Sequence, residues 1–224
     1  MSIAKSCSAV LLLGAIVECG TPAPTLYGRE PASGTCLTGP ALAEGRLKRC
    51  ERELQRHLDD REDDAAAWFE LGFVRCLIAG QRLARWQYTH GRCRTVISFP
   101  VTSQIDVDAH PDPALVRYQD LRAASERFAV DLRRAESAFR RCSGAEFKCP
   151  MDLAEVRFDV RGDRQAMLTL RDVIQDAWKL KRTAAADTAA DTATRFPVAF
   201  DQADAAWLLA KCHGYLAVTE FLPV

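Results

Sequence analysis

The sequence predicts a mainly α-helical fold of paired, tightly packed helices, with a small extended or β insertion near residues 96–108. Two observations predict it. Apolar residues recur every three to five positions in several long segments, which is the spacing of one helix face. Within 97–108 they instead alternate with polar residues, which is typical of extended chain. At 224 residues, the chain is long enough to form one domain with a sizeable core.

The composition is that of an ordinary globular protein. Hydrophobic residues make up 48% of the chain and charged residues 27%, and 30 basic residues balance 30 acidic ones. A net charge of zero gives no electrostatic reason to expect a nucleic acid or an anionic membrane surface as a partner. Most basic residues are arginines interleaved with acids, as on a solvated helix face.

The first 19 residues are predicted to be a secretory signal. One lysine precedes an apolar run from Ala9 to Val17, which is too short to span a bilayer. Cys19 is a candidate lipidation site, although Glu18 stands where such signals have a small residue. Cleavage near Ala23 and an uncleaved helix of a cytosolic protein are the alternatives. We therefore expect an exported protein, periplasmic or held at the membrane only through an N-terminal lipid.

Residues 20–40 are rich in Gly, Pro, Ser and Thr and are interpreted as a linker, and 41–224 as a single helical domain. The first helix is expected over 41–58. Its apolar stripe is Leu42, Leu47, Cys50, Leu54 and Leu58. The acidic run 59–64 then precedes the next helix, where carboxylates suit the positive end of the helix dipole.

Residues 65–92 are predicted to form a helical hairpin with its turn at Gly80. The segment carries a W-x2-L-G motif followed by a small and an aromatic residue: Trp68, Leu71, Gly72, Ala84 and Tyr88. This pattern resembles one tetratricopeptide repeat, a helix–turn–helix unit in which small residues let two helices approach closely. One repeat cannot bury its own face, so neighbouring helices are expected to complete it.

Three more helices are expected after the extended insertion. Asp112 and Pro113 predict the start of a helix that ends near Arg141. Its expected stripe is Leu115, Tyr118, Leu121, Phe128, Leu132, Ala135 and Phe139. A helix is then expected from about Gln165 to Lys181, followed by the low-complexity segment 183–194, and a last helix from about Gln202 to Phe221.

The part from residue 99 to 222 resembles a family of uncharacterised exported bacterial proteins. The similar segments are "FPV" before an Asp-Pro helix start, "RFAVDLRRAESAF", "VRFDVRGDR" and "FDQADAAWLLAKCHGYLAVTEFL". The resemblance implies a helical, tetratricopeptide-like fold and no established activity. Members continue well beyond the last segment, so a C-terminal truncation is one interpretation of the end at Val224.

The resemblance also suggests a calcium loop at 159–164, because members often carry a D-x-D-G-D-G stretch there. Asp159 and Asp163 match the first and fifth positions of such a loop. Arg161 and Arg164 replace an acid and the glycine, and an arginine repels a cation. The alternative is a turn in which Asp163 caps the following helix. We expect no cofactor, and calcium is the weaker interpretation.

The chain has nine cysteines, and no two of them have the CxxC spacing. This argues against a zinc ribbon or a thioredoxin-type motif. Cys142 and Cys149 flank a short loop, where a disulfide is geometrically easy in an oxidising compartment. The alternative is that the cysteines pack as small hydrophobic residues in a helical core. Connectivity cannot be derived from sequence, so both interpretations stay open.

No nucleophile elbow, phosphate-binding loop, dinucleotide fingerprint or HExxH motif is present, so we expect a protein that is not an enzyme. Grooves between stacked helices usually hold peptides or partner proteins. The predicted function is therefore an exported protein- or peptide-binding scaffold. The candidate ligand-binding residues are Arg75, Arg82, Arg85 and Tyr88, with a solvated helix face as the alternative. A degenerate calcium-binding module and a cell-envelope hydrolase are the alternative functions.

Overall fold

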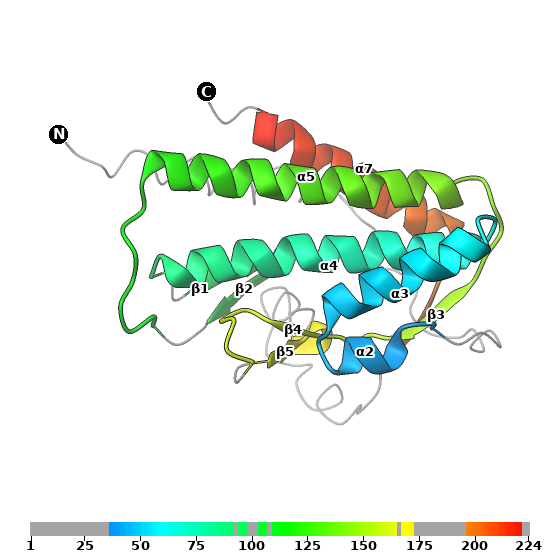
Figure 1. Ribbon diagram of the computed structural model, residues 1–224, viewed down its shortest axis with the longest axis horizontal. Coiled ribbons are helices and arrows are strands. Elements are labelled where there is room, and N and C mark those ends of the chain that lie inside the picture. Colours follow the sequence, from blue (N-terminus) through cyan, green and yellow to red (C-terminus); the bar gives the residue numbers. More distant parts are fainter. Residues whose placement is uncertain are drawn as a thin grey trace, which may run out of the picture.

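A computed structural model describes residues 36–91, 94–97, 103–106, 109–164, 167–172 and 196–220. The described part is mainly α-helical with small antiparallel sheets, which confirms the predicted fold class at that level (Figure 1). The signal segment with Cys19, most of the linker and the low-complexity segment lie outside the described residues. The helices are α2 (Gly39–Ala43), α3 (Leu47–Asp60), α4 (Ala65–Thr89), α5 (Tyr118–Cys142) and α7 (Gln202–Glu220).

The segment predicted as one helix over 41–58 is two helices, α2 and α3. Gly45 separates them in a left-handed conformation with φ of +66°, which a helix cannot contain and which glycine adopts without a steric penalty. The apolar stripe itself is confirmed, because all five of its members are buried: Leu42, Leu47, Cys50, Leu54 and Leu58. Burying this stripe against α4 places α3 beside the central helix.

The predicted hairpin at 65–92 is wrong, because α4 is one continuous helix that passes through Gly80. Asp64 caps its start, where its carboxylate accepts a hydrogen bond of 2.9 Å from the backbone N–H of Ala67. A glycine inside a helix costs only about 1 kcal/mol relative to alanine. More than half of α4 is buried, and this burial outweighs that cost many times over.

The small residue at position 72 does allow two helices to approach closely, but the second helix is α5. A Cβ atom on Gly72 would lie 2.7 Å from Cε1 of Phe139, closer than carbon atoms can approach. The two helices run antiparallel and side by side along their length (Figure 1). Phe139 also contacts the ring of Phe69, with centroids 5.8 Å apart. The centre of the core is therefore a glycine on α4 facing an aromatic ring on α5.

We expect Gly72→Ala to destabilise the protein and Gly80→Ala to stabilise it. At Gly72 the gain in helix propensity, about 1 kcal/mol, opposes an overpacking cost of about 1–3 kcal/mol against the fully buried ring of Phe139. At Gly80 nothing lies within 4 Å of the new Cβ, so only the propensity gain of about 0.5–1 kcal/mol applies. Urea unfolding of both variants measures the difference. Two changes of the same sign would contradict the assigned packing of α4.

Helix α5 begins at Tyr118, not at Asp112 as predicted. Residues 109–117 are not helical, and the backbone N–H of Ala114 donates to the carbonyl of Thr89 at 2.9 Å, which ties this segment to the end of α4. The first part of the predicted stripe is consequently outside the core, with Leu115 85% exposed and Tyr118 56% exposed. The buried residues of α5 begin at Ala129 and comprise Ala129, Asp131, Leu132, Ala135, Ala138, Phe139 and Cys142.

The described residues form three two-stranded antiparallel sheets, each of which contacts α4 (Figure 1). The predicted insertion is confirmed as a hairpin of β1 (Arg94–Ile97) and β2 (Ser103–Asp106). The other strands were not predicted from the sequence; they are β3 (Cys149–Asp152), β4 (Arg157–Asp159), β5 (Met167–Thr169) and β6 (Pro197–Phe200). β3 pairs with β6 and β4 pairs with β5. The helix predicted from about Gln165 is wrong at its start, because β5 occupies 167–169. Residues 170–172 are helical, and 173–181 lie outside the described part.

The last helix is confirmed as α7, which packs on α5. Asp201 precedes it and its carboxylate accepts a hydrogen bond from the N–H of Ala203 at 2.9 Å. The hydrogen bond from the Lys148 ammonium lowers the pKa of Asp201. Among the helices that the structure describes, none has both the length and the apolar character to cross a membrane.

Candidate functional site

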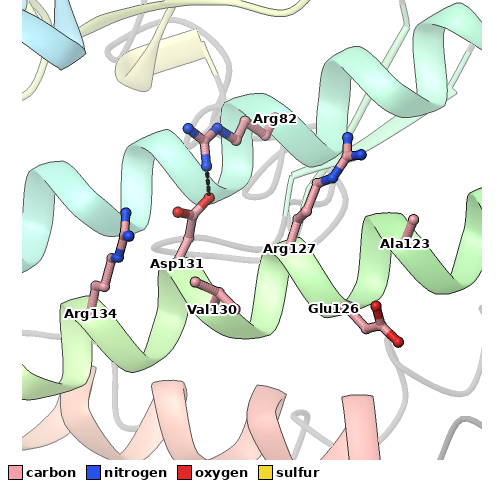
Figure 2. Close-up of a pocket in the computed structure, with 7 residues that line it drawn as sticks. All are labelled: Arg82, Ala123, Glu126, Arg127, Val130, Asp131 and Arg134. Carbon is pink, nitrogen blue, oxygen red and sulfur yellow. Dashed lines mark hydrogen bonds and ion pairs between the residues drawn. The ribbon is translucent and has the colours of Figure 1, made fainter.

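The candidate site is an open hollow of about 460 Å³ between α4 and α5. One residue comes from α4 and the others from the middle part of α5, between residues 123 and 134. The lining residues are Arg82, Ala123, Glu126, Arg127, Val130, Asp131 and Arg134 (Figure 2). Small and medium side chains form its apolar part, and charged groups form its sides.

A buried carboxylate lies in the hollow. The side chain of Asp131 is only 5% exposed, and Arg82 reaches across from α4 to pair with it at 2.5 Å (Figure 2). A buried carboxylate needs such a partner, since leaving it unpaired costs several kcal/mol. The Arg82 side chain itself is 48% exposed, so part of its guanidinium remains open to solvent. The pair joins α4 to α5 and neutralises the one buried charge of the hollow.

Two further arginines flank this pair. Arg127 and Arg134 point from α5 toward α4, one on each side of the contact between Arg82 and Asp131 (Figure 2). Among the residues that the structure describes, neither has an ion-pair partner. Glu126 does not neutralise them, because it points away from α4 and pairs with Arg122 at 2.8 Å. The hollow therefore carries an excess of positive charge.

The excess positive charge affects the pKa of a neighbouring arginine, Arg75. Burial lowers the pKa of the Arg75 guanidinium, and the positive charge of Arg134 lowers it further. The carboxylate of Glu51 acts in the opposite direction, at 3.3 Å from Arg75, without reversing the shift. The guanidinium of Arg75 remains charged, because an arginine pKa lies far above neutrality. An anionic ligand in the hollow would relieve the mutual repulsion of these arginines.

Of the four predicted ligand-binding residues, only Arg82 lines the hollow. Arg75 is mostly buried, pairs with Glu51 and donates to the carbonyl of Arg134 at 2.9 Å, so it joins three helices. Tyr88 is buried, with its ring edge against His110 at a centroid distance of 4.9 Å. Neither side chain lines the hollow, because both turn inward and pack against parts of the chain that are distant in sequence.

Arg85 also has a structural contact, in the turn at 159–164. Its guanidinium donates to the Asp159 carboxylate and to the Asp159 carbonyl, each at 2.9 Å. Asp159 is 3% exposed, and the turn passes through Gly162 at a φ of +90° and Arg164 at +61°. The oxygens that a calcium ion would need thus accept N–H groups, while Asp163 is exposed and pairs with Arg161 at 3.2 Å. These contacts favour a turn at 159–164, but Asp159 accepts its backbone N–H groups, and the next described residues, 167–169, form β5 and not the helix that Asp163 was predicted to cap.

The predicted disulfide between Cys142 and Cys149 is not confirmed, because both residues are buried free thiols. The Cys142 thiol donates instead to the carbonyl of Phe139 at 3.1 Å. Burial raises the pKa of Cys142 to about 11, so its thiol stays protonated at neutral pH. The packing interpretation of the cysteines, as small hydrophobic residues, describes both positions.

Three lining residues were not predicted although the sequence contains a signal for them: Arg127, Asp131 and Arg134. They are spaced four and three residues apart in the segment "RFAVDLRR", which places them on one helix face. The face could be read from the sequence, but its pairing with Arg82 on α4 could not. A buried acid at Glu70 was also missed; its position inside the apolar run "AWFELGF" is the signal that would have identified it.

Comparison with protein-family models, with curated proteins and with solved structures gives no match.

Proposed function

We propose that the protein is an exported, helical binding protein whose α4–α5 hollow holds an acidic segment of a partner protein or peptide. The observation that carries the proposal is the position of Arg127 and Arg134 on both sides of an already neutralised Arg82–Asp131 pair. Arg127 and Arg134 have no ion-pair partner among the described residues, so their charges are available to a ligand. By contrast, Arg75 and Arg85 on α4 already pair with carboxylates.

The chemistry of the hollow favours a carboxylate ligand. A guanidinium presents its N–H groups in a planar fork that matches a carboxylate, and two such groups flank the same space. Val130 adds an exposed apolar surface beside them, being 46% exposed. An acidic side chain next to an apolar one provides both contacts. An isolated small anion would leave the apolar surface uncovered.

The shape of the hollow and the net charge of the protein further limit the class of ligand that we propose. A hollow of about 460 Å³ that is open to solvent holds a few side chains of a longer chain and does not enclose a small molecule. The net charge of zero supports a local contact rather than attraction to a polyanion such as nucleic acid. A short extended or helical segment carrying Asp or Glu is therefore the proposed ligand class.

The test has two stages. Mild crosslinking in the native cells, followed by mass spectrometry, identifies the partner and the mature N-terminus. A synthetic acidic segment of that partner is then titrated with the wild-type protein and with R127A/R134A, using fluorescence anisotropy at low and high salt. Each lost charge-assisted hydrogen bond is worth about 1.5–3 kcal/mol, so we expect the affinity to fall at least tenfold.

Arg133→Ala is the matched control. Arg133 has the same charge and lies on the same helix, but its partner is Glu220 of α7 at 3.6 Å. We expect its affinity for the acidic segment to equal that of the wild type. Equal binding by R127A/R134A, or equal loss in the control, would overturn the proposal. An unprocessed Met1 in the native protein would overturn its export part alone.

A further inference from the structure

The only sulfur–sulfur contact among the described cysteines joins two distant helices. The Sγ atoms of Cys76 on α4 and Cys212 on α7 lie 3.8 Å apart. Both residues are buried, each with 1% of its surface exposed. The other thiols with described contacts have oxygen partners: Cys36 donates to the Glu70 carboxylate at 2.8 Å and Cys142 to the carbonyl of Phe139.

This contact lies where α7 has little other connection to α4. α7 packs mainly on α5, and α5 in turn packs on α4. A bond between Cys76 and Cys212 would thus join α4 and α7 directly. It would also close a loop of 136 positions, since the two residues are that far apart in sequence. Closing so long a loop removes much of the conformational freedom of the unfolded chain.

We propose that Cys76 and Cys212 are a disulfide-forming pair that locks α7 onto α4 when the protein folds in the presence of a disulfide oxidant. In the reaction, each thiol loses a proton and the two sulfurs form one S–S bond. The two electrons pass to the oxidant, a small-molecule or protein disulfide, which is reduced to two thiols. The reaction proceeds through a mixed disulfide, as in ordinary thiol–disulfide exchange. The inference does not depend on the binding function.

The burial of the pair determines when the bond can form. An oxidant cannot reach either sulfur while α7 is docked, and burial also raises the pKa of the Cys76 thiol, which keeps the nucleophilic thiolate scarce. We therefore expect the bond to form while α7 is still undocked during folding. The folded, reduced protein is expected to be oxidised only at the rate at which α7 opens.

The test compares two samples of the full chain. One is refolded from urea with a mixture of oxidised and reduced glutathione, and the other is folded under reducing conditions before the same mixture is added. Free thiols are then alkylated, and peptides are mapped without reduction. We expect a peptide containing Cys76 linked to one containing Cys212 in most refolded chains, and in few chains that were folded first. The linked protein is expected to melt roughly 5–10 °C higher.

Two variants sharpen the result. Cys212→Ala should abolish both the link and the rise in Tm, whereas Cys142→Ala, which removes a buried thiol outside the pair, should preserve both. Peptide mapping of the wild-type chain decides the outcome even where a variant folds poorly. A refolded wild-type protein in which Cys76 remains alkylated, or is linked to a residue other than Cys212, would overturn the proposal.

Discussion

Asp159→Ala is expected to lower the free energy of unfolding by about 3 kcal/mol. The carboxylate is almost fully buried and holds the 159–164 turn together. Oδ1 accepts the backbone N–H groups of Arg161 and Gly162, at 3.1 and 2.7 Å. Oδ2 accepts the N–H of Arg164 at 3.2 Å and the guanidinium of Arg85 at 2.9 Å. Alanine removes all four acceptor contacts at once, and equilibrium unfolding in urea measures the loss.

Asp163→Ala is the control for this prediction. Asp163 lies in the same turn and carries the same charge, but it is exposed and pairs with Arg161 at the surface. Its loss is expected to change stability by less than about 0.5 kcal/mol. Repeating both measurements with calcium and with a chelator tests the alternative function. A calcium-dependent gain in the stability of the wild type that both variants lose would show that the two aspartates bind the ion.

Glu70→Ala is expected to lower the free energy of unfolding by about 2–4 kcal/mol. Glu70 lies on α4 with 2% of its surface exposed and holds the chain that leads into α2. Its carboxylate accepts the backbone N–H groups of Leu37 and Thr38, at 3.1 and 2.9 Å, and also the Thr38 hydroxyl and the Cys36 thiol. Alanine leaves the buried N–H of Thr38 without an acceptor.

The loss of local stability should be largest near residue 38. This distinguishes the predicted role of Glu70 from a general weakening of the core. We expect limited proteolysis of Glu70→Ala to cleave near α2 faster than in the wild type, in addition to the shift of the urea transition. Glu53→Ala is the control, because Glu53 pairs only along the surface of α3 with Arg49. Its expected cost is about 0.3–0.5 kcal/mol. Comparable losses from both variants would contradict a specific role for Glu70.

Local patterns in the sequence predicted the helices whose apolar stripes face the core along their whole length. The stripe from Leu42 to Leu58 and the last helix are confirmed on this basis. Patterns failed where tertiary contacts decide the outcome. Gly80 reads as a turn locally, but burial of α4 on both sides of it keeps the helix intact. The strands β4 and β5 are only three residues each, which is too short for an alternation to be recognised.

The candidate site was less predictable than the fold, because its two sides, Arg82 on α4 and residues 123–134 on α5, lie far apart in the sequence. Arg82 could be named as a polar group on a clear helix, and so could Arg75 and Arg85. Nothing local distinguishes the arginine that lines a hollow from those that turn toward Glu51 and Asp159. That distinction depends on which acids the other elements bring within reach, and only the folded chain sets those distances.

Helix α4 contacts α3, α5, β1, β3 and β4, which are half of the other described elements and include two long helices. A region can open independently only if its departure leaves the remaining core closed. Removing any large neighbour would expose α4, so the protein should behave as one cooperative unit. Amide hydrogens in the middle turns of α4, near Phe73, should then exchange with solvent only through global unfolding. Their exchange rate would give the stability of the whole molecule without denaturant.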